Sequence, residues 1–344
     1  MYHLASVMPF MVCLVWTAIF LLEYRKSDPA RRALTVFGIA ATLLYFCHYL
    51  HFNGLQSVYS ESLYYLCNLS VYPLYSIYVK VLTEKRVPGA LNLLWFLPAA
   101  IVLVISLTGL VRDSYAFQIT EQILFALASV TATVVSAINL FRFRARVDNY
   151  YSNPGEKRLN PLMTLIALLL VTALASFTVN IIGRDNFMAT DNLIIPAVLF
   201  SVLLFTIFFV GNKTVFPHDE VRLGTATPVP EAQDILATDA LMEKIHQQME
   251  DRQIFRSKGL TISDLAESVG SNRTYVSACI NNEAGQSFSD YVNKWRIEYA
   301  MKLMKSDPAL TIAEVADKAG FTDRTTFYRS FKKISGMSPT EWLK

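Results

Sequence analysis

The sequence contains few charged residues: 17% of its 344 residues are Asp, Glu, Lys or Arg, whereas soluble domains carry about 25%. Hydrophobic residues make up 53% of the chain. They are concentrated, because seven long apolar stretches precede residue 212 and none of that length follows. The formal net charge of +3 is too small to indicate a partner for the chain as a whole. The length allows two or three domains, and the composition predicts a membrane-spanning part followed by a polar one.

Cysteine is also scarce, and the usual signatures of catalysis are missing. Cys13, Cys47 and Cys67 lie in apolar stretches and Cys279 lies in the polar part, so we expect four separate reduced thiols and no disulfide framework. The sequence has no glycine-rich phosphate loop, no paired metal ligands and no histidine-containing phosphorylation helix. His218 and His246 are isolated. These absences argue against a membrane kinase or protease, and we expect neither catalysis nor a cofactor.

Seven stretches have the length of a membrane span, which needs about 20 mostly apolar residues. They are Leu4–Leu22, Ala33–Phe52, Ser62–Leu82, Leu91–Leu110, Gln122–Phe141, Leu162–Ile182 and Asn192–Gly211. The first is too long for a cleaved signal peptide, and six more follow it. The third is the most polar, because it contains Asn68, Ser70, Pro73 and several tyrosines.

Basic residues alternate between the loops that join these spans. One set of loops contains Arg25, Lys26, Arg31, Arg32, Lys80, Lys85, Arg86, Arg142, Arg144, Arg146, Lys157 and Arg158. The opposite loops contain only Arg112 and Arg184. Basic loops stay in the cytoplasm, so the N-terminus is predicted to be outside and everything after Gly211 inside. An odd number of spans is required for this orientation, and seven supplies it.

Ionisable and aromatic residues gather near the predicted outer ends of three spans. They are His48, His51, Glu61, Tyr64, Asn68 and Glu121. Ionisable groups at membrane depth indicate a functional site, so these residues form a candidate pocket for a small-molecule or peptide signal. They also fit a second interpretation, in which they anchor span ends at the interface. No metal site is predicted, because two histidines three residues apart lack further converging ligands.

Small residues follow one face of the fifth span at helical spacing. Ala128, Ala132 and Ser136 are the clearest members. Small side chains let helix backbones approach closely, so this face packs either within the bundle or against a second copy in a homodimer.

Residues 212–238 differ from the spans before them. Pro217, Pro228 and Pro230 interrupt a polar segment that has no sustained apolar period. The segment is predicted to be a linker between the membrane domain, residues 1–211, and a helical domain, residues 239–344. As a flexible coil it would have an end-to-end distance of roughly 25–30 Å.

The helical domain contains the same pattern twice. Thr261-Ile262-x-x-Leu265-Ala266-x-x-x-Gly270 returns fifty residues later as Thr311-Ile312-x-x-Val315-Ala316-x-x-x-Gly320, and Gly285-x-Ser287 returns as Gly336-x-Ser338. Thr311 and Glu314 form a predicted capping box, and Thr261 with Asp264 a weaker one. The repeat predicts two helix-turn-helix units, about 261–282 and about 311–333, joined by a helix over Tyr291–Lys305.

The second repeat also resembles a known family. Its segment TIAEVADKAGFTDRTTFYRSFKKISGMSPTEWL is similar to the signature of AraC/XylS transcription regulators. Gly320-Phe321, Phe327, Phe331, Lys332-Lys333, Gly336 and Ser338-Pro339 carry the likeness. The first repeat resembles versions of this domain in membrane-bound regulators of the Bacteroides group. The likeness covers about 100 residues and implies an all-helical domain that binds double-stranded promoter DNA.

The resemblance implies that the second helix of each unit enters a major groove, over about Arg273–Asn281 and about Arg324–Lys333. The residues it places toward bases are Arg273, Thr274, Ser277, Arg324, Thr325, Tyr328 and Arg329, and it places Lys332 and Lys333 toward phosphates. The first copy departs from the family at Ala278 and Asn281, where many members carry Arg and Lys. Residues 239–344 have 15 Lys and Arg against 14 Asp and Glu, a net charge of only +1. A helical domain that no longer binds DNA therefore stays an alternative.

These features together predict an all-α protein of the bacterial inner membrane. A seven-helix bundle would sense a signal, and a tethered cytoplasmic domain would bind DNA and regulate transcription. The other hypothesis is a transporter or channel with a regulatory DNA-binding tail, although no span has a clear charge at its midplane.

Overall fold

The computed structural model describes residues 2–24, 27–84, 89–109, 114–152, 159–187, 193–213 and 235–343. These residues are largely α-helical, and the only β pairing among them is one isolated bridge between Tyr151 and Thr261. The prediction of an all-α protein is confirmed. The chain divides into an N-terminal unit, Met1–Phe141 with Asn160–Phe216, and a C-terminal unit, Arg142–Leu159 with Pro217–Lys344.

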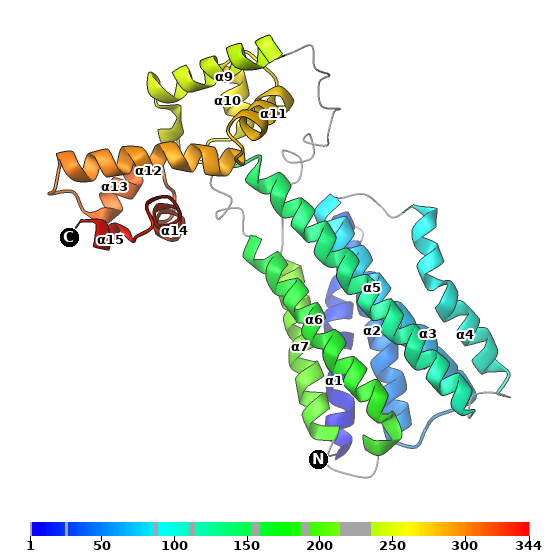
Figure 1. Cartoon of the computed structure of the whole chain (residues 1–344). Helices are drawn as coiled ribbons and strands as arrows, with labels where there is room; N and C mark the ends of the chain where they lie inside the picture. Colours follow the sequence, from blue (N-terminus) through cyan, green and yellow to red (C-terminus); the bar gives the residue numbers. More distant parts are fainter. Residues whose placement is uncertain are drawn as a thin grey trace. The chain divides into compact units, whose positions relative to one another are not determined.

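The N-terminal unit is a bundle of long helices (Figure 1). Its elements are α1 (Tyr2–Leu22), α2 (Pro29–Phe52), α3 (Val58–Glu84), the 3-10 helix η2 (Ala90–Phe96), α4 (Leu97–Leu107), α5 (Tyr115–Asp148) as far as Phe141, α6 (Leu159–Ile182), the 3-10 helix η4 (Arg184–Phe187) and α7 (Ile194–Lys213). Helix α2 packs against α1, α3 and α7, and α3 also packs against α4.

Five helices of the described chain are long and apolar enough to cross a membrane. They include Leu4–Leu22, Pro29–Phe52, Tyr115–Asp148, Met163–Ile182 and Ile194–Asn212. The predicted fourth span contains a shorter apolar helical stretch, Asn92–Leu107, which changes from 3-10 to α geometry at Leu97. The predicted third span is helical within α3 but is not among the five. The seven-span count therefore stays a prediction.

Helix α3 is polar because it packs its polar groups inside the bundle. Ser62 and Asn68 are buried. The Tyr72 hydroxyl lies 3.1 Å from the Thr172 carbonyl oxygen and 2.8 Å from Ser176 Oγ, and the Tyr75 hydroxyl donates to the Leu165 carbonyl oxygen at 2.8 Å. These contacts join α3 to α6 and satisfy groups that would be costly to bury alone.

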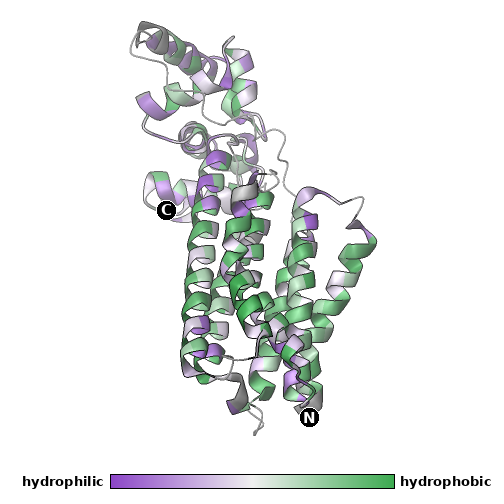
Figure 2. Ribbon diagram, turned by 90° about the vertical axis from the view of Figure 1, so that its right-hand side faces the viewer, coloured by the Kyte–Doolittle hydropathy of each residue, from purple (hydrophilic) through white to green (hydrophobic). Residues whose placement is uncertain are grey.

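The outward faces of the N-terminal unit are apolar instead. Large exposed hydrophobic side chains occur on several helices, among them Val104, Leu127, Leu174 and Val202. Figure 2 shows the hydrophobic colouring along these helices. Continuous apolar surface of this kind is rare on soluble proteins and is suited to lipid, in which helices satisfy their own backbone groups.

The C-terminal unit consists of two similar halves joined by a long helix (Figure 1). The first half contains α9 (Ile235–Glu250), the 3-10 helix η8 (Ile254–Arg256), α10 (Ile262–Ser268) and α11 (Arg273–Glu283). Helix α12 (Phe288–Ser306) connects it to α13 (Ile312–Lys318), α14 (Arg324–Ser335) and α15 (Pro339–Trp342). The second half has its own core, built around Phe321, Phe327 and Phe331 and completed by Ile297 and Ala300 of α12.

Two segments differ from the boundaries expected from the sequence. Helix α7 continues to Lys213 and α9 begins at Ile235, so both enter the predicted linker 212–238. The rest of that linker lies outside the described residues. In addition, the last residues of α5 and the segment after it are grouped with the C-terminal unit, although no sequence pattern connects them to it.

Candidate nucleic-acid interface and candidate ligand pocket

Matching caps start the first helix of both helix-turn-helix units. Thr261 precedes α10 and accepts a hydrogen bond from the Asp264 backbone amide, while the Asp264 side chain accepts from the Thr261 amide. Thr311 and Glu314 form the same reciprocal pair before α13. Such capping boxes satisfy helix-end amides that otherwise lack partners. Both predicted capping boxes are present.

A glycine follows the first helix of each unit in the left-handed region, with φ of +66° at Gly270 and +86° at Gly320. Their surroundings differ. A Cβ at Gly320 would lie 2.6 Å from the Arg256 carbonyl oxygen, whereas a Cβ at Gly270 would have no neighbour within 4 Å. Gly320 therefore permits both the turn and a close backbone approach from the first half.

Helix α14 has one buried face and an opposite face that is exposed and cationic. Asp323 caps it by accepting from the Thr326 amide at 2.7 Å, and Gly336 ends it with φ of +81°. Thr326, Phe327, Ser330 and Phe331 are buried. The opposite face exposes most of the predicted DNA-contacting residues: Arg324, Thr325, Arg329, Lys332 and Lys333, with Tyr328 half-buried. This face matches a helix that docks into a negatively charged groove.

Arg324 and Tyr328 form a pair on this face. The Arg324 guanidinium donates to the Tyr328 hydroxyl at 3.3 Å and lies 5.4 Å from the ring centroid. The hydrogen bond from Arg324, followed by a contact with Thr340, lowers the pKa of the Tyr328 hydroxyl. The pair holds two neighbouring donors one helical turn apart.

Lys333 is engaged in an ion pair with the connecting helix. Its Nζ lies 2.6 Å from Asp290 Oδ1 of α12, and both side chains are substantially exposed. An exposed pair of this kind contributes about 0–1 kcal/mol, so a phosphate can replace the carboxylate at little cost. Lys332, also exposed, is the more available of the two predicted phosphate contacts.

Helix α11 offers a less charged face. Asn272 caps it by accepting from the Tyr275 amide at 3.0 Å. The predicted contacts Arg273, Thr274 and Ser277 are all partly exposed. Sequence reasoning missed Tyr275, a residue that is 45% exposed on the same helix. Comparing the repeats would not have found it, because Tyr275 corresponds to Thr326, which is buried in the second unit.

The N-terminal unit contains a cavity of about 80 Å³ that three of the predicted ligand residues line. His48, Tyr64 and Asn68 contribute to it. Sequence reasoning missed most of the lining: Tyr45 and Phe52 of α2, Ser176 and Asn180 of α6, Phe187 of η4 and Phe200 of α7 all take part. The lining is mainly aromatic and apolar with a few amide and hydroxyl groups, a composition typical of small-molecule sites.

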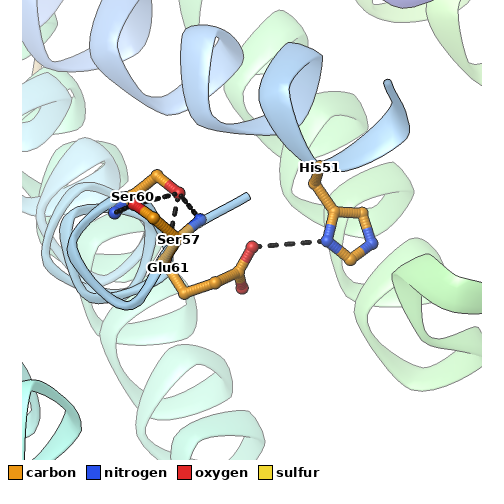
Figure 3. A network of polar contacts seen from close by, with 4 residues as sticks. All are labelled: His51, Ser57, Ser60 and Glu61. Atoms are coloured by element: carbon orange, nitrogen blue, oxygen red, sulfur yellow. Dashed lines mark hydrogen bonds and ion pairs between the residues drawn. The ribbon is translucent and has the colours of Figure 1, made fainter. Parts of the chain in front are cut away.

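The other three predicted residues form polar contacts beside this cavity. His51 Nδ1 lies 3.3 Å from Glu61 Oε1, and each residue is only 7% exposed (Figure 3). Ser57 and Ser60 form reciprocal contacts at the start of α3, where the Ser57 amide donates to Ser60 Oγ at 2.7 Å. Asn68 donates to Glu121 Oε1 at 2.8 Å, which links the cavity lining to α5. The described residues contain no cluster of three or more His, Cys, Asp or Glu suited to a metal ion.

A family model matches the C-terminal part of this molecule. Residues 265–344 match a family of helix-turn-helix domains. The chain is 36% identical over 74 residues to the uncharacterized transcriptional regulatory protein YesN of Bacillus subtilis, covering 21% of this chain and 20% of YesN. It is 31% identical over 93 residues to the transcriptional regulatory protein HptR of Staphylococcus aureus, covering 27% of this chain and 36% of HptR.

A solved structure of a Listeria innocua protein of unknown function is 26% identical and covers 33% of this chain and 96% of its own, with a TM-score of 0.24. The chain spans about a fifth to a third of the length of the two regulators above. Residues 265–344 form a helix-turn-helix domain of the AraC type, as the resemblance implied. The N-terminal unit lies outside the matched residues.

Proposed function

We propose that the chain is a membrane-embedded transcription regulator that binds promoter DNA through α11 and α14. The observation that carries this proposal is the exposed cationic face of α14, presented by a helix-turn-helix domain in the same chain as an apolar helical bundle. The regulators YesN and HptR support the transcriptional role.

The two recognition helices have different tasks in this proposal. Arg329 pairs with a guanine edge, because its exposed guanidinium has two parallel donors that match O6 and N7. Arg324 and Tyr328 contact a neighbouring base or phosphate, and Lys332 and Lys333 contact phosphates. Thr274 and Ser277 of α11 make weaker base contacts, and Arg273 starts that helix. With a net charge of only +1 over 239–344, specific contacts outweigh non-specific attraction.

The N-terminal unit embeds the protein in the inner membrane, with the C-terminal unit in the cytoplasm. The basic loops assigned to the cytoplasm support this orientation. Among the described ones, Arg31 and Arg32 lie at the start of α2, and Arg142, Arg144 and Arg146 lie at the end of α5. A cytoplasmic C-terminus is what DNA binding requires.

The cavity beside His48, Tyr64 and Asn68 is the proposed signal site. Its mainly apolar lining with a few amide and hydroxyl groups suits a small, largely apolar molecule with one or two hydrogen-bonding groups. Glu61 and Glu121 contact residues around it rather than the space itself. A ligand there changes the output only if it binds two states of the bundle with different affinity.

The direct test is selection of duplexes from a random library by the full-length protein in lipid nanodiscs. We expect one enriched motif, bound about a thousandfold more tightly than random duplex at physiological salt. Arg329→Ala should weaken the enriched site by about 1–3 kcal/mol and relax one base position. The matched control, Lys302→Ala on the exposed side of α12, should change neither. Equal binding of all duplexes would contradict the proposal.

A further inference from the structure

The segment that follows α5 binds the C-terminal unit directly. We call Asp148–Ser152 the clasp. The Ser152 amide donates to the Leu260 carbonyl oxygen at 3.0 Å, and the Ile262 amide donates to the Tyr150 carbonyl oxygen at 2.9 Å. Between these bonds, Tyr151 and Thr261 form the isolated antiparallel bridge. The clasp therefore attaches at the start of α10, the first helix of the first helix-turn-helix unit.

Side chains strengthen this attachment. Ser152 is fully buried, and its Oγ donates to the Leu260 carbonyl oxygen at 2.7 Å and accepts from Arg296 Nη2 at 3.2 Å. The Ser152 carbonyl oxygen accepts from Ser289 Oγ at 3.2 Å. The clasp is thus held by both α10 and α12, and a hydroxyl buried with partners on each side indicates a specific contact.

The clasp also lies beside residues that the proposed function assigns to DNA. The Tyr150 hydroxyl is 3.2 Å from Ser263 Oγ on α10, the helix that precedes α11. Asp148 Oδ2 lies 3.8 Å from Arg144 Nε on its own helix. Burial raises the pKa of the Asp148 carboxyl, whereas the charges of Arg144 and, more weakly, of Arg329 and Lys333 of α14 lower it. An acidic group thereby shares cations with the surface where phosphates would bind.

We propose that the clasp is an autoinhibitory contact, which weakens DNA binding by α11 and α14 until movement of α5 releases it. This inference rests on the proposed function. Duplex DNA carries one negative charge per about 1.7 Å of its axis, so DNA and Asp148 compete for the same cations. The bound clasp keeps the Tyr150 hydroxyl against Ser263 of α10, the helix that precedes α11 in the first helix-turn-helix unit.

Helix α5 is suited to transmit the release. Its residues 115–141 belong to the N-terminal unit and its last turns to the C-terminal unit. It contains neither proline nor glycine over its 34 residues, so no residue that commonly kinks a helix separates its two parts. Glu121 near its far end accepts from Asn68 of the cavity lining. A ligand that moves α5 would therefore displace the clasp.

The test locks the clasp with a disulfide in the full-length protein in nanodiscs. Tyr151 and Thr261 are a non-hydrogen-bonded antiparallel pair, whose Cα atoms are about 4.5 Å apart in such ladders, a separation that suits a disulfide. Tyr151→Cys/Thr261→Cys should cross-link under mild oxidation and lose DNA affinity by about tenfold or more. Reduction should return the affinity of the double variant to that of the single variant Thr261→Cys, which cannot form this cross-link. The wild type, whose four described cysteines are buried, should not respond to oxidation.

A second variant opens the clasp without cross-linking. Asp148→Asn should tighten binding to the selected duplex about two- to fivefold, the range expected for one partly exposed charge interaction. Glu298→Gln, an equal charge change on the exposed side of α12, is the matched control and should have less effect. If the cross-linked protein binds the selected duplex as tightly as the reduced protein does, the autoinhibitory role of the clasp is overturned and the proposed function stays intact. Failure of the cysteines to cross-link would also overturn it, and failure of every form to bind DNA would overturn both.

Discussion

Arg296 of α12 offers the sharpest prediction about what holds the C-terminal unit together. Its side chain is fully buried. Its Nε donates to the Phe255 carbonyl oxygen at 2.6 Å, and its Nη2 donates to the Ser257 carbonyl oxygen at 2.9 Å and to Ser152 Oγ at 3.2 Å. The guanidinium carbon also lies 5.5 Å from the centroid of the Phe321 ring. One side chain therefore joins the clasp, η8, α12 and the second repeat.

The loss of stability expected for Arg296→Met follows from the carbonyl oxygens that would lose their hydrogen-bond donor. The Phe255 carbonyl oxygen would lose this charge-assisted bond, and a buried acceptor without a partner costs about 1–3 kcal/mol. The Ser257 carbonyl oxygen would keep a long bond from the Leu260 amide at 3.4 Å, so its loss is smaller. Methionine would keep part of the packing on Phe321. We expect the free energy of unfolding of the C-terminal unit to fall by about 2–4 kcal/mol, a large share of the 5–15 kcal/mol that is usual for a domain.

Pulse proteolysis across a urea series measures the free energy of unfolding of the C-terminal unit in the full chain in micelles. A C-terminal tag reports how much of this unit stays intact. The matched control is Lys294→Met, two residues earlier on the exposed side of α12, which should change stability by less than about 0.5 kcal/mol. Equal midpoints for the two variants would refute the account of Arg296 as a buried hub.

Further predictions concern the turn, the recognition helix and the cavity. Gly320→Ala should destabilise the C-terminal unit by at least about 3 kcal/mol, because a Cβ there would be strained by the positive φ and would lie 2.6 Å from the Arg256 carbonyl oxygen. Gly270→Ala should cost only about 1–2 kcal/mol, because only the strain at positive φ applies. The midpoints of urea unfolding of the two variants test this difference. Lys332→Ala should weaken all duplexes alike and reduce the slope of log affinity against log salt by about one unit, and a sequence-selective loss would assign Lys332 to a base. Glu61→Gln should remove the charge acting on His51 and alter a promoter reporter's response to its inducing condition without changing membrane insertion; an unchanged response would leave both residues as interface anchors.

The helix-turn-helix units could be predicted closely from the sequence because their rules are local. Thr261 and Thr311 mark helix starts by capping, and Gly270 and Gly320 mark turns by their backbone freedom. The spacing of Phe327 and Phe331 fixes which face of α14 is buried and hence that Arg329 is exposed. These features depend on residues a few positions apart.

The spans were only partly predictable, because hydropathy does not show where a polar group finds its partner. Tyr72 and Tyr75 make α3 polar in sequence, yet both are satisfied by α6 in the fold. The clasp could not be predicted at all. Ser152 and Leu260 are 108 residues apart, and nothing in the local pattern around Tyr150 distinguishes a docked segment from an ordinary loop between spans. Such contacts depend on tertiary placement rather than on periodicity.

The central claim, that a membrane-embedded chain binds specific DNA through α11 and α14, has one most direct test. Sealed inside-out vesicles carrying the full-length protein are titrated with the selected duplex and with a scrambled duplex of equal length. We expect the vesicles to capture the selected duplex about a thousandfold more tightly than the scrambled one. Arg329→Ala should weaken capture of the selected duplex by about 1–3 kcal/mol and leave capture of the scrambled duplex unchanged. Capture of both duplexes with equal affinity, or capture unaffected by Arg329→Ala, would contradict it.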